Sequence, residues 1–255
     1  DWAEAAKKID ERGFDTLWTW DHFYPLYGVE GAPLDRPLPR GVDPNRLGDH
    51  FEAWTLLTAL ACITKKVDIG LLVSCNSYRN SNLLADMART IDHISHGRLI
   101  FGIGSGWYEK DYQEYGYEFG TAVGRLKDLE KSLPVIKERW SKLKPAPVRS
   151  PIPIMIGGGG EKFTLRLVAE HAHQWNGVGP PDLMAHKNRV LDQWCEKVGR
   201  DPASIERSVA LTTPDTLDNL DQYYQAGMRH FILAMGAPFD FEHADRLLEW
   251  KRKRS

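Results

Sequence analysis

The sequence has few of the features that mark disulfide-stapled, metal-binding or membrane proteins. Its 255 residues include three cysteines, Cys62, Cys75 and Cys195, without a CxxC spacing, which argues against a disulfide framework or a zinc site and favours a reducing cytoplasm. No apolar run is long enough to cross a bilayer. The formal net charge is only −2 and the single basic cluster, 251–254, lies at the end of the chain, so neither nucleic acid nor a membrane is an expected partner.

What the chain does have is an alternation of strand-like and helix-like apolar patterns over its whole length. The strand-like runs are 14–20, 67–73, 99–103, 152–156, 173–178, 205–211 and 230–235. The helical stripes are 2–9, 54–64, 83–94, 126–140, 161–172, 182–198, 214–226 and 243–251. Within the fourth stripe, Pro134 predicts a kink or a break. The alternation predicts a single α/β domain over residues 1–255, with a parallel sheet and right-handed crossovers.

Eight helices against seven strands predict a (β/α)₈ TIM barrel whose first strand lies upstream of Asp1. A seven-stranded open sheet is the alternative, but nothing in the sequence marks the reversal of strand order that such a sheet needs. In a TIM barrel the functional groups lie on the loops that follow the strands. The residues after each strand are therefore expected to form one site.

Small and polar residues gather at several of these strand ends. The candidates for the site are Asp21, His22, Ser74, Cys75, Asn76, Arg79, Gly104, Ser105, Gly106, Gly158, Gly159, Gly160 and Lys162. Glycines let a flat or phosphorylated ligand approach backbone N–H groups, and a glycine run before a helix also presents the positive end of the helix dipole. Asp21 and His22 form an ionisable pair directly after a strand. We expect no metal ion.

Three familiar motifs fail on inspection. "GIGSG" is not a dinucleotide-binding GxGxxG that opens a helix, and "GGGGEKF" lacks the Lys-Ser/Thr pair of a P-loop. "HAH", His171 to His173, resembles a pair of metal ligands but precedes its strand, which would place it on the stabilising face of the barrel. We therefore interpret both histidines as structural.

Two further features lie near the expected site. The proline-rich stretch from Phe23 to Asp49 is expected to be a lid or a binding loop. For Glu52 a role at the start of a helix is favoured over one at the barrel mouth.

Four segments carry a resemblance to a known family: "GFDTLWTWDHF", "GLLVSCNSYRN", "RLIFGIGSGWYEKDYQEYGYEF" and "PIMIGGGGEKFTLRLVAEHAHQWN". Together they resemble the luciferase-like monooxygenase superfamily, and most closely its coenzyme F420-dependent oxidoreductases. The segments cover about a quarter of the chain and occur in the order of the family. The resemblance implies the barrel fold described above.

The resemblance also implies roles for the candidate residues. Ser74 and Cys75, with Asn76, match a bulge against the cofactor ring that often contains a non-prolyl cis peptide bond. Gly104, Ser105 and Gly106 would line the ring or its side chain. Gly158, Gly159 and Gly160 would bind the cofactor phosphate, with Arg79 and Lys162 as further contacts to anionic groups. His22, with Asp21, would exchange a proton during hydride transfer.

The expected function is a coenzyme F420-dependent oxidoreductase that transfers a hydride between the deazaflavin and a small organic substrate. The alternative is an FMN-dependent monooxygenase that uses reduced flavin and oxygen, and a barrel that binds ligand without chemistry is a weaker one. Relatives commonly pair through outer helices, so a homodimer is expected. The sequence does not identify the substrate.

Overall fold

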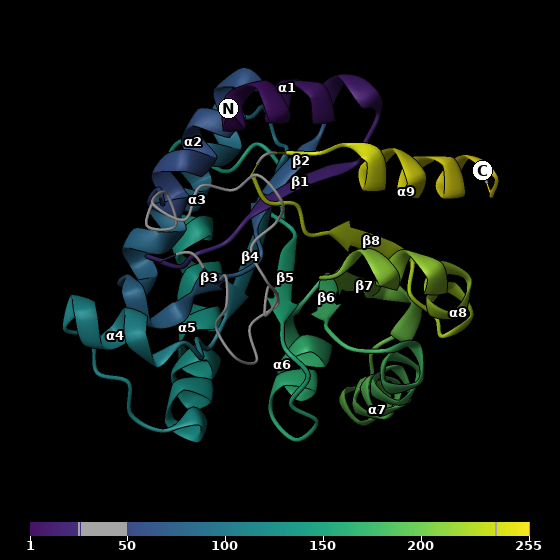
Figure 1. Cartoon of the computed structure of the whole chain (residues 1–255). Coiled ribbons are helices and arrows are strands. Elements are labelled where there is room, and N and C mark those ends of the chain that lie inside the picture. The colour runs from purple at the N-terminus through teal and green to yellow at the C-terminus, as the bar shows by residue number, and fades with distance from the viewer. Residues whose placement is uncertain (25, 27–49, 238, 255) are drawn as a thin grey trace.

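The centre of the computed structural model is a curled sheet in which every strand pair is parallel (Figure 1). The structure describes residues 1–24, 26, 50–237 and 239–254. The strands are β1 (Thr16–Thr19), β2 (Asp68–Leu71), β3 (Ser74–Cys75), β4 (Leu99–Gly104), β5 (Ile154–Gly157), β6 (Gln174–Gly177), β7 (Glu206–Leu211) and β8 (His230–Leu233). The order across the sheet is β1-β2-β4-β5-β6-β7-β8, and the short β3 pairs with β4 beside this path.

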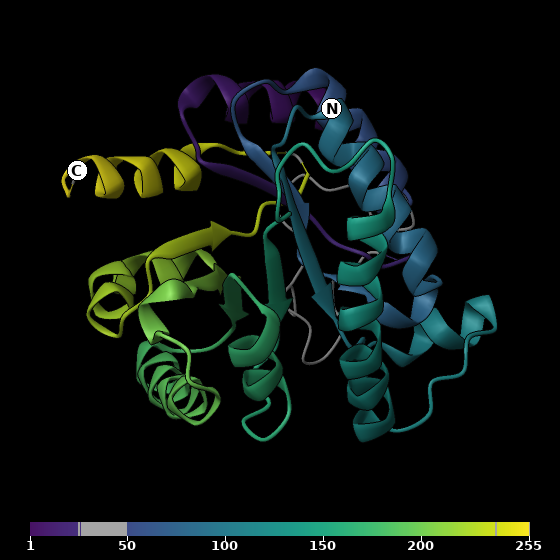
Figure 2. The ribbon, with the colours of Figure 1, turned by 180° about the vertical axis from the view of Figure 1, so that it is seen from behind.

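Helices cover the outer, convex face of the sheet, as the front and back views show (Figures 1 and 2). The α-helices are α1 (Trp2–Arg12), α2 (Ala53–Ile63), α3 (Ser81–Ile94), α4 (Glu109–Tyr115), α5 (Ala122–Lys142), α6 (Thr164–His171), α7 (Pro181–Val198), α8 (Leu220–Gln225) and α9 (Glu242–Arg252). In the described ranges there are also three 3₁₀ segments, η2 (Asn76–Tyr78), η3 (Pro202–Ser204) and η4 (Pro214–Asn219). None of the described helices combines the length and apolar character needed to cross a membrane.

Alternation along β4 explains why the sheet has two apolar layers. Leu99, Phe101 and Ile103 belong to the large core between the sheet and the helices. Ile100 points the other way, into a smaller cluster with Met155 and Ile232 on the concave side. The strand is buried on both faces, as its continuous apolar run predicts.

All seven predicted strands are present, but a closed barrel is not shown. Within the described residues the sheet runs from β1 to β8, and no ladder joins those two strands. A cleft of about 1430 Å³ lies along this open side, where Leu17 of β1, Phe231 of β8 and Leu247 of α9 are among the lining residues. The molecule is thus a curled α/β half-barrel, and closure into a full barrel remains a prediction.

Three local features differ from the sequence prediction. Of the kink or break expected at Pro134, the break is wrong, because α5 continues through this residue, with Leu133 and Ile136 buried on either side. The helix expected over 214–226 is divided into η4 and α8. Helix α4 and strand β3 were not predicted, since both are short and α4 is mostly polar.

Two other predictions concern residues away from the strand ends. His171 contacts Lys137 Nζ, and His173 Nδ1 accepts a hydrogen bond of 3.1 Å from the backbone N–H of Ile154. Both histidines, which precede β6, therefore contact other parts of the protein.

The lid or binding loop expected over Phe23 to Asp49 lies outside the described residues apart from positions 23, 24 and 26.

Candidate functional site

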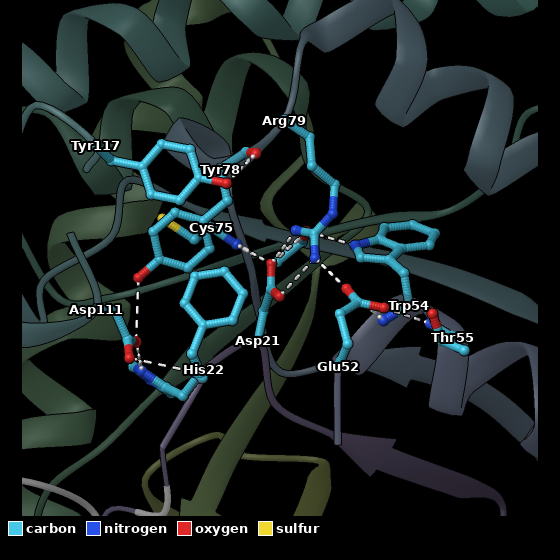
Figure 3. Close-up of polar contacts among 12 residues, drawn as sticks. Asp21, His22, Glu52, Trp54, Thr55, Cys75, Tyr78, Arg79, Asp111 and Tyr117 are labelled. Atoms are coloured by element: carbon cyan, nitrogen blue, oxygen red, sulfur yellow. Dashed lines mark hydrogen bonds and ion pairs between the residues drawn. The ribbon is translucent and has the colours of Figure 1, made fainter. Parts of the chain in front are cut away.

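Asp21, just after β1, links the carboxyl end of that strand to β3 and the segment that follows. Its Oδ2 accepts hydrogen bonds from the Ser74 hydroxyl at 3.1 Å and from the Cys75 backbone N–H at 2.9 Å. Arg79 donates to both carboxylate oxygens, from Nη1 to Oδ2 at 2.6 Å and from Nη2 to Oδ1 at 3.0 Å. Asp21 is buried, so these donors replace its water shell (Figure 3).

Arg79 is held from a second side by Glu52, the N-cap of α2. The two Glu52 oxygens accept hydrogen bonds from the backbone N–H groups of Trp54 and Thr55, and Oε1 also pairs with Arg79 Nη2. Burial alone would lower the pKa of Arg79, but the two carboxylates raise it above its ordinary value. Glu52 is therefore the helix cap that was favoured, and it is also a second carboxylate partner of Arg79.

His22 is paired with Asp111 of α4 and not with its neighbour Asp21. The Nδ1 of His22 lies 2.7 Å from Asp111 Oδ2, and the same oxygen accepts a hydrogen bond of 3.1 Å from the Tyr78 hydroxyl. Asp111 Oδ1 accepts from the backbone N–H of Phe23 at 3.2 Å. Figure 3 shows the side chains of Asp21 and His22 directed to these different partners.

Aromatic side chains surround His22 at the carboxyl end of the sheet. Its ring meets those of Trp20, Trp107 and Tyr108 edge-on, with centroids 6.2, 5.6 and 5.6 Å away. His50 stacks on Trp20, and burial lowers the pKa of His50. The His22 side chain keeps 14% of its surface exposed and Trp107 keeps 45%, so this aromatic group is open to a small ligand.

Ser74 and Cys75 make their side-chain contacts within the protein. The Ser74 hydroxyl accepts from Trp54 Nε1 at 2.9 Å, and the Cys75 Sγ lies 3.2 Å from the Tyr112 hydroxyl. Burial raises the pKa of Cys75, which keeps this thiol protonated at neutral pH. Asn76 differs, because its buried Oδ1 has no partner among the described residues.

The glycines at the end of β4 and just beyond it accommodate neighbouring side chains. A methyl group on Gly106, whose φ is +80°, would lie 2.0 Å from the Tyr112 hydroxyl and 2.6 Å from Cys75 Sγ. One on Gly104 would lie 2.7 Å from a methyl carbon of Val73. Ser105 contributes its carbonyl oxygen, which accepts from the Tyr112 hydroxyl at 3.4 Å.

A cis peptide bond between residues that are not proline is present at Leu72–Val73. It lies two residues before Ser74–Cys75, the position to which the resemblance pointed. Val73 projects over the concave side of the sheet, where its methyl groups also lie within 3.0 to 3.2 Å of the place that a side chain on Gly157 would occupy. The ends of β3, β4 and β5 are therefore packed around this one valine.

Gly158, Gly159 and Gly160 form an exposed turn between β5 and α6. The Gly158 N–H donates to the Asn176 carbonyl, whereas those of Gly159 and Gly160 have no acceptor in the described part of the chain. Exposed Lys162 has no acidic partner among those residues either, and Glu161 is already bound by His186 and Lys187. This turn presents free N–H groups and a positive charge to solvent.

The predicted site residues thus fall into three neighbouring groups at one edge of the sheet. Ser74, Cys75 and Arg79 each bond to Asp21, and His22 lies with Asp111 and the aromatic rings. The third group is glycine-rich, with Gly104 packed against Val73 and Gly158, Gly159 and Gly160 in the turn after β5. No group of three or more potential metal ligands occurs in the described ranges.

The sequence analysis missed three residues of the site, Asp111, Tyr78 and Tyr112. One available signal was the spacing of Tyr108, Tyr112 and Tyr115, which is that of one helical face and could have indicated the helix that carries Asp111.

Comparisons with known proteins agree on a family. A model of the luciferase-like monooxygenase family matches residues 1–254. An uncharacterized protein of Mycobacterium tuberculosis is 24% identical, with 91% of this chain and 86% of that protein covered. An F420-dependent glucose-6-phosphate dehydrogenase of Amycolatopsis mediterranei is 30% identical over 63% of this chain and 48% of its own length. A pyrimidine monooxygenase of Variovorax paradoxus is 25% identical over 73% and 56%.

Among solved structures, an F420-dependent secondary alcohol dehydrogenase in complex with an F420-acetone adduct is similar, with a TM-score of 0.75. The match covers 91% of this chain and 87% of that one, at 16% sequence identity. At this identity the likeness shows a shared fold.

Proposed function

The chain belongs to the luciferase-like monooxygenase family, and on that premise we propose that it is a coenzyme F420-dependent oxidoreductase acting on a small organic substrate. The observation that carries the proposal is the partly exposed His22, held by Asp111 and ringed by aromatic side chains beside the glycine-lined strand ends. Two F420-dependent enzymes support this choice of cofactor, one similar in sequence and the other similar in fold.

The residues at the strand ends fit a flat cofactor that carries a phosphate. The free N–H groups of Gly159 and Gly160, with Lys162 beside them, would bind the phosphate. Asn76 has an unused buried oxygen and would hydrogen-bond the ring. Coenzyme F420, when bound, would supply a two-electron hydride donor or acceptor. The guanidinium of Arg79 is already bound by Asp21 and Glu52. To make its predicted contact with an anionic group of the cofactor, the guanidinium would have to bind that group and the two carboxylates at once.

His22 would hold the proton that accompanies the reaction. Its Nδ1 is bound to Asp111, so Nε2 is the ring atom left to accept a proton from a substrate hydroxyl or to return it to a carbonyl. Trp20, Trp107 and Tyr108 would place an apolar substrate beside that nitrogen and exclude water. The predicted catalytic role of Asp21 remains a prediction, since its carboxylate faces Arg79.

The cofactor is tested by equilibrium binding of the purified chain to F420 and to FMN in parallel, at matched salt. We expect tight F420 binding and weak FMN binding. The reverse preference would favour the alternative, an FMN-dependent monooxygenase, which the pyrimidine monooxygenase among the relatives supports. Binding of neither cofactor would overturn both proposals.

The role of His22 is tested by His22→Ala in protein that still binds the cofactor. Loss of general acid–base catalysis typically lowers turnover by about 10²- to 10⁴-fold. Lys131→Ala, in an exposed ion pair with Asp128, is the control that should leave turnover unchanged. Unchanged turnover in His22→Ala with bound cofactor would rule out the role.

A further inference from the structure

We infer that Asp111 is a positioning residue that keeps the proton of neutral His22 on Nδ1 and thereby leaves Nε2 as the proton acceptor. Tyr78 has a supporting part, since it fixes the Asp111 carboxylate. The inference rests on the proposed function, in which His22 exchanges a proton with the substrate, and it assigns a role to a helix that is absent from the sequence prediction.

The hydrogen-bond partners of Asp111 determine the direction of its bond to His22. An ionised carboxylate can only accept, so the 2.7 Å contact between Asp111 Oδ2 and His22 Nδ1 requires a proton on Nδ1. The other two contacts of this carboxylate, from the Tyr78 hydroxyl and the Phe23 N–H, are donors as well. Asp111 is fully buried, so these three contacts account for its hydrogen bonding.

Tyr78 remains a donor over the whole working range of pH. Burial first, and then the neighbouring Cys75 and Asp111, raise the pKa of Tyr78 far above its ordinary value. Its hydroxyl therefore stays protonated and donates to Asp111 Oδ2 at 3.1 Å. Among the described residues, the titratable groups around His22 other than Asp111 are His50, Tyr108 and Tyr78, none of which accepts from Nδ1.

Helix α4 has a second anchor that does not depend on Asp111. Phe23 stacks on Tyr115 with centroids 3.8 Å apart, and its ring also meets that of Tyr78 at a tilt, with centroids 4.8 Å apart. Tyr112, on the same helix, is fully buried and bonded to Ser77 and Cys75. A change confined to the carboxylate should therefore alter His22 while α4 stays in place.

The test is Asp111→Asn in the full chain, followed by ¹⁵N NMR of histidine-labelled protein without cofactor. The His22 signals are assigned by their loss in His22→Gln. We expect the unchanged protein to carry the proton on Nδ1. The variant has an amide that can donate to Nδ1, and we expect a shift toward the tautomer with the proton on Nε2. Asp128→Asn, the same chemical change at an exposed ion pair, is the control.

Turnover is measured on the same proteins loaded with whichever cofactor binds. Asp111→Asn should lower kcat by about 10- to 100-fold and leave KM within about twofold, because substrate binding does not involve the carboxylate. Tyr78→Phe should lower kcat by a smaller factor. A merely structural role would change stability without moving the tautomer.

The outcomes separate this inference from the proposed function. A proton on Nε2 in the unchanged protein overturns the inference whatever cofactor binds, and so does an Asp111→Asn variant with the original tautomer and full turnover. Failure to bind F420 or FMN, with the proton on Nδ1, overturns the proposed function alone. If Asp111→Asn does not fold, the tautomer of the unchanged protein and the Tyr78→Phe result still decide.

Discussion

The guanidinium of Arg79 and the carboxylate of Asp21 face each other through two hydrogen bonds, and their side chains are only 11% and 1% exposed. Glu52 pairs with the same guanidinium from the start of α2. The three side chains join the ends of β1 and η2 to α2, so the cation adds rigidity where the strand ends meet. Breaking the Asp21–Arg79 pair is costly, because the charge that stays behind is held largely away from water.

Asp21→Ala should therefore destabilise the fold by about 3 to 5 kcal/mol, the usual cost of breaking a buried pair. Urea unfolding measures the change. Asp128→Ala, which removes an exposed pair with Lys131, should cost less than about 1 kcal/mol. The double variant Asp21→Ala/Arg79→Ala should lose less than the sum of the single losses, and strict additivity would contradict the pairing.

Gly106→Ala should destabilise more than Gly116→Ala, although both glycines have a positive φ, +80° and +72°. The left-handed conformation alone costs an alanine about 1 to 2 kcal/mol. At Gly116 nothing lies within 4 Å of the added carbon, whereas at Gly106 it would meet the Tyr112 hydroxyl and Cys75. We expect an additional loss of about 1 to 3 kcal/mol at Gly106 from this overlap. Thermal or urea unfolding would show it, and equal losses would place Tyr112 elsewhere.

The native protein should present one reactive thiol. Cys62 is exposed, whereas Cys75 and Cys195 are buried and burial raises the pKa of both thiols. Titration with a disulfide reagent at pH 8 should show one fast equivalent and two more after unfolding. Cys62→Ser should abolish the fast phase, and a fast phase that survives would mean that Cys75 is accessible.

Asp10 should make stability depend on pH in the acid range. Burial alone would raise its pKa, but N–H donors from Val67, Lys66 and Lys65, followed by Arg98, hold the pKa below its ordinary value of 3.8. Since the folded pKa is the lower one, this stabilisation is complete above the unfolded value and is lost as the pH falls through the folded value.

Urea midpoints between pH 6 and about pH 2 test this linkage. The unchanged protein should lose stability more steeply below about pH 4 than Asp10→Asn does, and parallel curves would argue against a lowered pKa.

Lys162→Ala should weaken binding of the phosphate-bearing cofactor by about fivefold, or ~1 kcal/mol, and should reduce the salt dependence of binding. Lys131→Ala is the matched control, since Lys131 is also exposed and lies in an ion pair on α5. Equal affinities of the two variants would place the phosphate away from the glycine turn. The fold should be unaffected, because Lys162 has no acidic partner among the described residues.

Much of the fold could be predicted because its elements are long and periodic. The continuous apolar run of β4 and the helical stripe of α3 carry their own signal, and Gly13 ends α1 in the left-handed conformation that favours glycine. Helix α4 has seven residues and lies against the site through tyrosines, so its polar sequence resembles a loop. Pro134 is tolerated within α5, whose buried residues continue on both sides.

The candidate site was predicted as a set of positions, but its pairings were not. Asp21 precedes His22 in the chain, yet successive residues at a strand end point in different directions, and the two side chains have separate partners. Asp111 is 89 positions from His22, and only the tertiary fold brings them together. Arg79 was predicted to contact an anionic group. Its pairing with Asp21 and Glu52 was not predicted, because charge alone does not reveal which carboxylates lie beside a cation.

The packing of Val73 limits the order in which this protein can accept substitutions. Its methyl groups fill the space next to Gly104 and Gly157, which belong to two different strands. A larger residue at either glycine would be tolerated only after Val73 had become smaller, so the order in which substitutions arise matters. A chimera that joined this protein to a relative between β3 and β4 would inherit a valine from one parent and glycines from the other. Such a hybrid should fold only where both parents share the same combination.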